Sequence, residues 1–356
     1  MSRKTGKGKK DDKPPPPIGP GSKISALPNQ VKRHLHPRQL GTRGMDLQWS
    51  TTSIKTLPAE VYKNEEVCQV AKSLDASNNR IKKLPKAVSS LAELRTVNLK
   101  NNQMNTLPGS LAKMKQLNYL DVSDNNLRSL PATMHKASGL TEIIASGNRL
   151  KSIPAKLGST GNLNSLDVSR NMIKSLKKNI YKLPIQLNVS HNLLKDLPKI
   201  DVKNPMIHVI DASHNNLEQL PNGIENLACL TRLDLSHNDL EELPLHLGLL
   251  KYLSVLDVSH NHLRFMPEEI CNLETALKTL NLAANSLDYL PEDLQKLKKL
   301  TSLDASQNHI KNLPIMIDLH CLQIVHLTSN QLTNIDPLVD LSACEGISAQ
   351  CMHVLQ

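Results

Sequence analysis

An asparagine recurs along this chain at an almost constant spacing, and this recurrence limits the possible folds more than any other feature. Consecutive members are 23 residues apart in eight of eleven intervals, and 21, 24 and 22 residues apart in the other three. Self-similarity at such a period predicts a solenoid, in which each repeat stacks against its neighbours. A divergent unit with Thr52 at the asparagine position precedes them, so we expect about thirteen units. The asparagines lie at positions 79, 102, 125, 148, 171, 192, 215, 238, 261, 285, 308 and 330.

Residues 230–244, LTRLDLSHNDLEELP, represent the repeat. Leu233 and Leu235 are two residues apart, so they face the same side of a short strand. The other three leucines of the segment are expected to join them, which gives each unit an apolar edge. One unit cannot bury this edge alone, and stacking of neighbouring units buries it.

Two further positions of the repeat have a structural explanation. Asn238 lies where the chain turns inward out of the strand, and its amide has two donors and an acceptor for buried backbone groups of adjacent turns. Pro244 fixes φ and has no N–H, so it favours an extended or 3₁₀ return over a long helix.

The pattern LxxLxLSxNxLxxLP with a period near 23 resembles the cytosolic leucine-rich repeat proteins. Its style is nearest to the Ras–Raf scaffold type and the plant intracellular Ras-group proteins, and the resemblance covers residues 45–336. It implies an α/β leucine-rich repeat solenoid, a curved right-handed superhelix. A parallel β-sheet would line its concave face, with short 3₁₀, helical or extended segments on the convex side.

The pattern predicts four segments: a disordered basic, proline-rich tail over residues 1–23, an N-terminal cap over 24–46, the solenoid over 47–336 and a C-terminal cap, expected to be helical, over 337–356. In the N-terminal cap, apolar residues follow a roughly helical spacing that Pro37 interrupts. They are Ile24, Leu27, Val31, Leu35 and Leu40.

Composition argues against secretion and membrane insertion. No apolar run approaches the length of a transmembrane helix, and no apolar segment follows the basic first residues. The six cysteines are scattered, which favours buried, reduced thiols in a cytoplasmic protein, and no CxxC or paired Cys/His spacing indicates a metal site. Aromatic residues are only 2% of the chain, which a solenoid filled by Leu, Ile and Val tolerates.

Charge is distributed unevenly along the chain, whose net charge is +10. Residues 1–44 contain 11 Lys and Arg against 2 Asp. Residues 45–180 contain 20 basic against 10 acidic residues, whereas residues 181–356 contain 12 against 21. The repeat array is therefore expected to have a basic first half and an acidic second half.

Three consecutive units read DASH, DLSH and DVSH, which superficially resembles three hydrolase triads. We reject catalysis there, because the set recurs with the structural period and no GxSxG nucleophile elbow is present. The histidines at 191, 214, 237 and 260 form a column in which stacked imidazoles titrate near neutral pH, and we do not expect a metal on them. The sequence thus predicts neither an enzyme nor a cofactor.

Partner recognition is expected at the positions that the repeat leaves free, on the concave strands and the rim beside them. An interface there would depend on a few aromatic and Arg anchors, and the acidic column would attract a basic partner. The candidate residues are Tyr119, Ile144, Arg170, Val209, Asp211, Arg232, Asp234, Val255 and Asp257.

Phe265 and Tyr289 occupy one variable column, two places after the core residues Leu263 and Leu287. We expect them to be partly buried against neighbouring turns. The alternative is an exposed binding hot spot, and for this reason both belong to the candidate partner-binding set.

These features favour an intracellular scaffold or regulatory adaptor that binds a protein on its concave face, with the role in signalling that the resemblance implies. The alternative is binding of a polyanion, or of the acidic tails of cytoskeletal polymers, through the basic tail and the basic first half. Few aromatics accompany the Lys and Arg residues, so nucleic acid is a less favoured partner but stays open. We expect a cytoplasmic location, with a nuclear one as the alternative that the basic tail allows.

Overall fold

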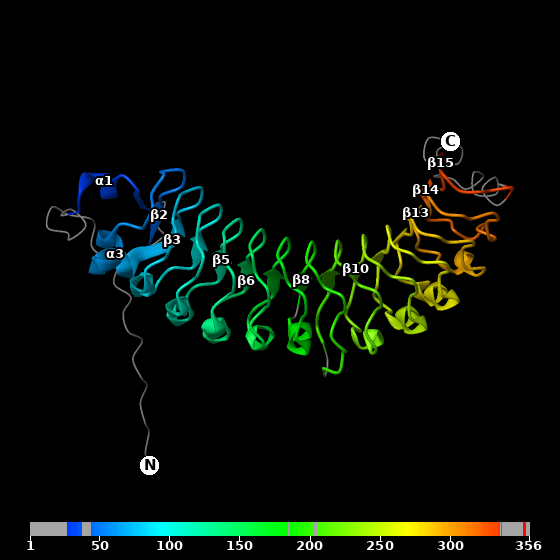
Figure 1. Cartoon of the computed structure of the whole chain (residues 1–356), viewed down its shortest axis with the longest axis horizontal. Coiled ribbons are helices and arrows are strands. Elements are labelled where there is room, and N and C mark those ends of the chain that lie inside the picture. Colours follow the sequence, from blue (N-terminus) through cyan, green and yellow to red (C-terminus); the bar gives the residue numbers. More distant parts are fainter. Residues whose placement is uncertain are drawn as a thin grey trace, which may run out of the picture.

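The chain forms a shallow arc of stacked turns, in which short helical turns line the outer edge (Figure 1). This computed structural model describes residues 27–37, 44–183, 185–202, 205–334, 336 and 352–353. The tail expected over 1–23 lies outside the described residues. The cap expected over 337–356 also does, apart from residues 352–353.

Every turn contributes one strand to a single sheet whose strands follow sequence order. β1 pairs with β2 antiparallel, and each later pair is parallel. The strands are β1 Leu35–Pro37, β2 Met45–Gln48, β3 Ala71–Asp75, β4 Thr96–Asn98, β5 Tyr119–Asp121, β6 Glu142–Ile144, β7 Ser165–Asp167, β8 Gln186–Asn188, β9 Val209–Asp211, β10 Arg232–Asp234, β11 Val255–Asp257, β12 Thr279–Asn281, β13 Ser302–Asp304, β14 Ile324–His326 and β15 Met352–His353.

The outer edge consists mainly of short 3₁₀ turns, as the prolines predict. Five of these turns follow directly on a proline; Pro244 at the start of one has φ −70°. The turn after Lys177, where the repeat lacks its proline, still forms. The helices are α1 Asn29–Lys32, α2 Ala59–Lys63, α3 Glu65–Val70, η1 Lys86–Ser90, η2 Gly109–Lys113, η3 Ala132–Lys136, η4 Leu157–Ser159, η5 Lys178–Lys182, η6 Ile224–Asn226, η7 Leu245–Leu249, η8 Glu268–Leu273 and η9 Leu294–Lys296.

The core is one continuous column of aliphatic side chains between the sheet and the outer turns. All five leucines of the 230–244 segment are buried, with at most 4% of their surface exposed. Each fully buried aliphatic side chain contributes about 1.5–3 kcal/mol, and stacking repeats this contribution at every turn.

The recurring asparagines form a ladder through this core. Asn238 Nδ2 donates to the backbone oxygens of Leu235 (2.9 Å) and Ser236 (3.2 Å) in its own turn, and to that of Ala212 (3.1 Å) in the turn before. Its Oδ1 accepts from the backbone N–H of Leu217 at 3.0 Å. Thr52 replaces the asparagine in the first unit, as predicted, and its hydroxyl donates to Trp49 O and Asn79 Oδ1.

The N-terminal end differs from the helical cap that the spacing predicts. Only Asn29–Lys32 are helical, and Leu35 lies in β1, opposite Leu47 of β2. An antiparallel strand satisfies the exposed edge of the first parallel strand directly, which a helix cannot do. Leu27 and Val31 are buried in the same hydrophobic core as the first turn, whereas Ile24 and Leu40 lie outside the described residues.

Removal of one ladder amide should destabilise the whole array. Asn238→Ala leaves the N–H of Leu217 and three backbone oxygens without their side-chain partner, so we expect a loss of about 2–4 kcal/mol in the free energy of unfolding. Urea denaturation followed by circular dichroism measures it. The control is Asn216→Ala, because Asn216 is exposed; similar losses in both variants would contradict the role of the ladder.

Candidate functional site

The inner face of the sheet presents two outward-facing residues per strand on either side of one buried residue. In β10, Arg232 and Asp234 face outward and Leu233 is buried. In-register pairing aligns these positions into two rows across the sheet. Variable residues that lie 23 apart in sequence therefore become neighbours, about 4.8 Å apart.

Six of the candidate residues come together on β9, β10 and β11. The first row brings Arg232 between Val209 and Val255, and the second row aligns Asp234 with Asp211 and Asp257. We call this group of six the central concave patch. It combines two apolar side chains, one cation and three carboxylates on three adjacent strands.

Tyr119 and Ile144 lie elsewhere on the same face, on β5 and β6. β5 is four strands from β9, about 19 Å along the sheet. Burial raises the pKa of the Tyr119 hydroxyl above its ordinary value, and the neighbouring Asp121 and Glu142 raise it further. Tyr119 is thus an amphipathic contact separate from the central concave patch.

The aspartates of the second row also stabilise the turn that follows each strand. Asp234 Oδ1 accepts from the backbone N–H of Ser236 (3.2 Å) and from its hydroxyl (2.8 Å). Asp257 and Ser259 make the same pair of bonds. The serine hydroxyl therefore donates to the carboxylate instead of being activated by an imidazole, which supports the rejection of a catalytic triad.

The second carboxylate oxygens face the inner surface, where two of them already have partners. Arg232 lies 3.4 Å from Asp234 Oδ2, and Asn281 Nδ2 donates to Asp257 Oδ2 at 2.9 Å. These contacts orient the carboxylates and partly offset their mutual repulsion. The carboxylate row thus presents negative charge in a defined position on the inner face.

The residue before each ladder asparagine has a positive φ, which turns the chain sharply out of the strand. Arg170 lies at this position, on the rim beside the sheet, and the four histidines of the column occupy it in the next four turns, with φ between 51° and 53°. Adjacent rings stack with centroids 4.0 Å apart and planes 9–10° from parallel.

Stacking explains the electrostatics of the histidine column. Burial is the main cause that lowers the pKa of His214, and the neighbouring His191 lowers this pKa further. Burial also lowers the pKa of His237, followed by the effects of His260 and His214. Parallel rings cannot direct their lone pairs to one point, and the described residues contain no group of three or more His, Cys, Asp or Glu that could hold a metal ion.

Phe265 and Tyr289 lie after the ladder asparagine, on the side of the solenoid rather than on the strands. Their exposed fractions are 42% and 51%, so about half of each side chain is buried and about half is exposed, and a binding hot spot there stays a prediction. The neighbouring turns have Glu242 and Asn312 at the same position, both exposed. Each turn buries the apolar residue that follows the aromatic one instead, and the ring points outward.

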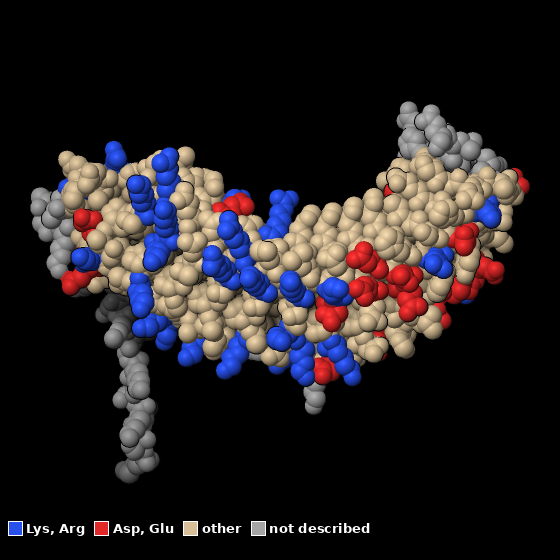
Figure 2. All heavy atoms as spheres, viewed as in Figure 1, with Lys and Arg blue, Asp and Glu red and all other residues tan. Residues whose placement is uncertain are grey.

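Net charge changes sign along the molecule, as the sequence predicts. On the face shown in Figure 2, Lys and Arg gather over the N-terminal half and Asp and Glu over the C-terminal half. On the side of the solenoid the change falls between Lys195 and Glu218, whose charged groups are 3.8 Å apart.

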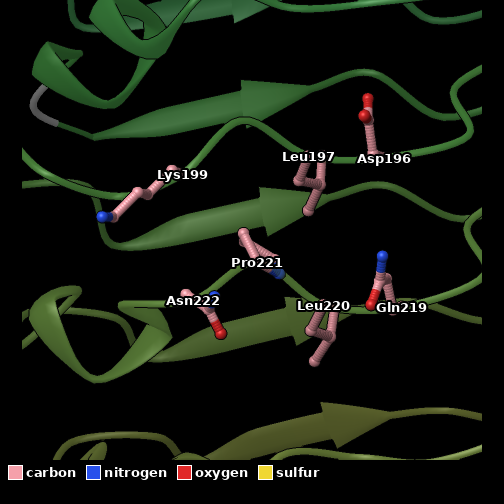
Figure 3. Close-up of a pocket in the computed structure, with 7 residues that line it drawn as sticks. All are labelled: Asp196, Leu197, Lys199, Gln219, Leu220, Pro221 and Asn222. Carbon is pink, nitrogen blue, oxygen red and sulfur yellow. The ribbon is translucent and has the colours of Figure 1, made fainter.

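A shallow cavity of about 220 Å³ opens near this crossover, between two neighbouring turns. In Figure 3, Asp196 and Gln219 project from matching points of the two segments, with Lys199 and Asn222 at the other end. Leu197 and Leu220 form its floor, and both are largely buried. No motif marks these residues in the sequence, because the cavity forms only where two neighbouring turns lie side by side.

Exposed apolar residues were also missed. Met172 and Leu193 are 45% and 40% exposed and occupy the position directly after the ladder asparagine, where most other turns have polar residues. Comparison of that single column across the repeats would have revealed them. Leu245, Leu249 and Tyr252 are exposed on and after η7, on the outer side.

The expectation of buried thiols is correct for one of the four described cysteines. Cys271 is buried in η8, and burial raises its pKa to about 12. Cys68, Cys229 and Cys321 are partly exposed, so the expectation is wrong for them. All four are free, whereas Cys344 and Cys351 lie outside the described residues.

In the part of the chain that the structure describes, no helix is long and apolar enough to cross a membrane.

Comparisons with known proteins point to one architecture. One family model, described as a leucine rich repeat, matches residues 71–127 and 250–310, and a second model with the same description matches residues 229–250. No curated protein matches the chain by sequence.

Three solved structures are similar. A leucine-rich repeat protein from Leptospira interrogans is 27% identical, with a TM-score of 0.65 over 86% of this chain and 91% of that one. The leucine-rich effector protein YopM from Yersinia pestis is 27% identical, with a TM-score of 0.58 over 81% and 78%. A plant peptide hormone receptor, RGFR1, in complex with RGF2 has a TM-score of 0.71 over 87% of this chain and 51% of that one, and at 23% identity it shows the fold alone.

The histidine column should make stability depend on pH. The pKa values of His214 and His237 are lowered in the folded chain, so below the ordinary value near 6.5 the unfolded chain binds protons first. Stability is therefore full above this pH and falls as the pH drops toward the folded-state pKa values. Urea midpoints between about pH 8 and pH 5, the range in which histidine titrates, measure the effect.

The control replaces both histidines by asparagine, which tolerates the positive φ and occupies this position at Asn78 and Asn101. The double variant should lose less stability on acidification than the parent chain. Equal losses in the two proteins would contradict the effect of stacking on the pKa values.

Proposed function

We propose that this leucine-rich repeat protein is a protein-interaction module that acts as an intracellular scaffold or regulatory adaptor. The partner would be a protein that docks on the concave face, and the role would be in signalling. We propose a cytoplasmic location on the family resemblance, with the nucleus as the alternative.

The central concave patch is the observation that carries this proposal. It brings together six candidate residues from three adjacent strands, at positions that neither the core nor the ladder requires. Arg232 lies between two valines, and the carboxylate row lies beside it. Such a combination fits a partner segment with a basic side chain flanked by apolar ones, because the carboxylates offer charge-assisted hydrogen bonds and the valines an apolar contact.

Three of the five remaining candidates extend this site along the face, whereas Phe265 and Tyr289 lie on the side of the solenoid. Tyr119 and Ile144 provide a second contact on β5 and β6, and Arg170 lies on the rim between the two groups. A partner that spans both contacts would be at least one small domain in length. Anchors of this kind, a tyrosine and an arginine, are among the residues that dominate measured binding energies.

The test removes the negative charge of the three aspartates of the central concave patch but keeps the hydrogen bonds that stabilise the turns after the strands. Asn188 occupies the carboxylate row and bonds the N–H and hydroxyl of Ser190 as the aspartates bond theirs. The triple variant D211N, D234N and D257N should therefore fold normally and bind its concave-face partner at least tenfold more weakly, because the charged contacts are lost. Affinity capture identifies partners, and titration calorimetry of each purified partner gives the dissociation constant.

The control variant carries E60Q, E274Q and E292Q, which remove the same charge from three exposed residues away from the concave strands. Partners that the control keeps and the triple variant loses are concave-face partners. Equal affinities of every partner for all three proteins would overturn the proposed site.

A second candidate function has one observation in its favour, the basic first half of the array (Figure 2). A polyanion, or the acidic tail of a cytoskeletal polymer, would bind along these Lys and Arg residues and the basic tail. Nucleic acid is the less favoured version, because few aromatic residues accompany the cations.

Salt dependence tests this second candidate directly. We expect poly-glutamate to bind the full chain with an affinity that falls steeply as salt rises from about 50 to 200 mM, because released counterions drive such binding. A chain without residues 1–23 should bind more weakly and with a shallower salt slope. Fluorescence anisotropy measures both, and binding that is independent of salt and of the tail would exclude the candidate.

A further inference from the structure

The side of the solenoid carries a charge pattern that the concave-face function does not use. We define the flank as the residues three and four places after each ladder asparagine. At the third place the turns from the third to the sixth asparagine present Arg128, Lys151, Lys174 and Lys195. All four side chains are exposed.

The same column becomes mainly acidic beyond the crossover. The seventh to tenth turns present Glu218, Glu241, Arg264 and Asp288, all exposed. Lys195 and Glu218 stand on either side of the change, and their charged groups approach to 3.8 Å. The flank thus has two blocks of nearly opposite charge and equal length.

Side-chain size at the fourth place follows the same division. Ser129 and Ser152 occupy it in the third and fourth turns, and both are small and exposed. Phe265 and Tyr289 occupy it in the ninth and tenth turns, and both project into solvent. One block is therefore recessed where the other block protrudes.

These blocks fit each other across a two-fold axis. Both halves of the arc curve toward the same side (Figure 1). The two-fold axis lies in the plane of the arc and passes between the sixth and seventh asparagines. Rotation about it reverses the direction of the arc and places the flank of one copy against the flank of the other. The curvature of the two arcs then matches, and the interface is isologous.

In this register the third turn of one copy faces the tenth turn of the other, and the sixth faces the seventh. Arg128 then lies opposite Asp288, Lys174 opposite Glu241 and Lys195 opposite Glu218. Lys151 faces Arg264, which is the one like-charge pair among the four. Symmetry doubles every pair, so the register forms six attractive contacts against two repulsive ones.

The fourth-place residues fit in the same register without further adjustment. Tyr289 faces Ser129 beside Arg128, and Phe265 faces Ser152 beside Lys151. A large ring meets a small residue in each case, and the adjacent cation can lie over the ring face, which contributes a cation–π contact. Dyads placed on the sixth turn, on the seventh turn, or between the seventh and eighth turns bring Arg264 against Arg128, Lys174 or Lys195 and leave fewer attractive pairs. A dyad between the fifth and sixth turns has as many attractive pairs, but it places Tyr289 against the long, exposed side chain of Lys83 instead of a serine.

We propose that the flank binds a second copy of this chain, antiparallel and face to face. Eight turns with two flank positions each supply about sixteen residues per copy, below the 20–30 residues of a standard interface. The dimer should therefore dissociate reversibly, with a dissociation constant between about 1 and 100 µM.

Such a dimer goes beyond the proposed function and leaves the concave face free. The two-fold axis keeps both concave faces on the same side, so two partners, or two sites on one partner, can bind together. Linked sites of this kind bind a bivalent partner more tightly than either site alone.

A charge swap tests the register. In Lys174→Glu, the introduced carboxylate of each copy would face Glu241 of the other, and in Glu241→Lys two lysines would meet. Each variant alone should dimerise about tenfold more weakly than the parent chain. An equimolar mixture should form a heterodimer at parental strength, because both pairs are then attractive. Sedimentation equilibrium of the full chains at about 50 mM salt, where screening is weak, measures all three constants.

The control is Lys136→Glu, an exposed reversal in η3 that lies off the flank. It should dimerise like the parent chain and should not rescue Glu241→Lys in a mixture. The double variant F265A and Y289A should also weaken the dimer, while the circular dichroism spectrum stays unchanged.

Three results would overturn the inference: a chain that remains monomeric up to about 100 µM, variants that dimerise like the parent, or a mixture that is no tighter than its components. A monomeric chain in which Lys174→Glu weakens poly-glutamate binding would assign the basic block to the second candidate function instead. None of these results bears on the concave-face proposal, whose test uses different residues.

Discussion

The amide of the recurring asparagine is the interaction on which the rest of the structure depends. A turn of this solenoid leaves the strand sharply, so several of its backbone groups are buried without a partner in their own strand. Each ladder asparagine makes four hydrogen bonds to such groups. Its amide N–H groups donate to two backbone oxygens of its own turn and to one of the turn before it, and its oxygen accepts from a backbone N–H of the turn before it. Because a buried backbone group without a partner costs about 1–3 kcal/mol, this one side chain makes the stacking of leucines possible.

This constraint determines which residues are free for binding. Leucines fill the interior, the asparagine holds the turn, and the aspartate with its serine fixes the exit from the strand. What remains are the first outward residue of each strand, the second carboxylate oxygen of each aspartate, and the flank beyond the asparagine. Recognition is therefore divided between two surfaces, a concave one that combines an arginine, valines and carboxylates, and a lateral one with two opposite charge blocks.

Much of this follows from the sequence, because a period of 23 fixes which residues become neighbours. The strands, the 3₁₀ turns, the bonds of Asn238 and the alignment of Asp211, Asp234 and Asp257 could all be predicted from it. The exposure of Phe265 and the strand at Leu35 could not, because they depend on how neighbouring turns and the first edge strand are covered. The complementarity of the flank blocks also could not be predicted from the sequence, because it depends on how the turns are placed along the arc.

Hydrogen exchange of single amides tests the central claim, that the asparagine ladder holds the array together, most directly. The N–H groups of Leu217, Leu240 and Leu263 donate to asparagine side chains of the next turn rather than to the backbone. Measured by NMR or mass spectrometry under native conditions, they should exchange as slowly as the strand amides, through global unfolding only. If they exchange as fast as exposed loop amides while the strands stay protected, the ladder does not hold the turns together and the account is wrong.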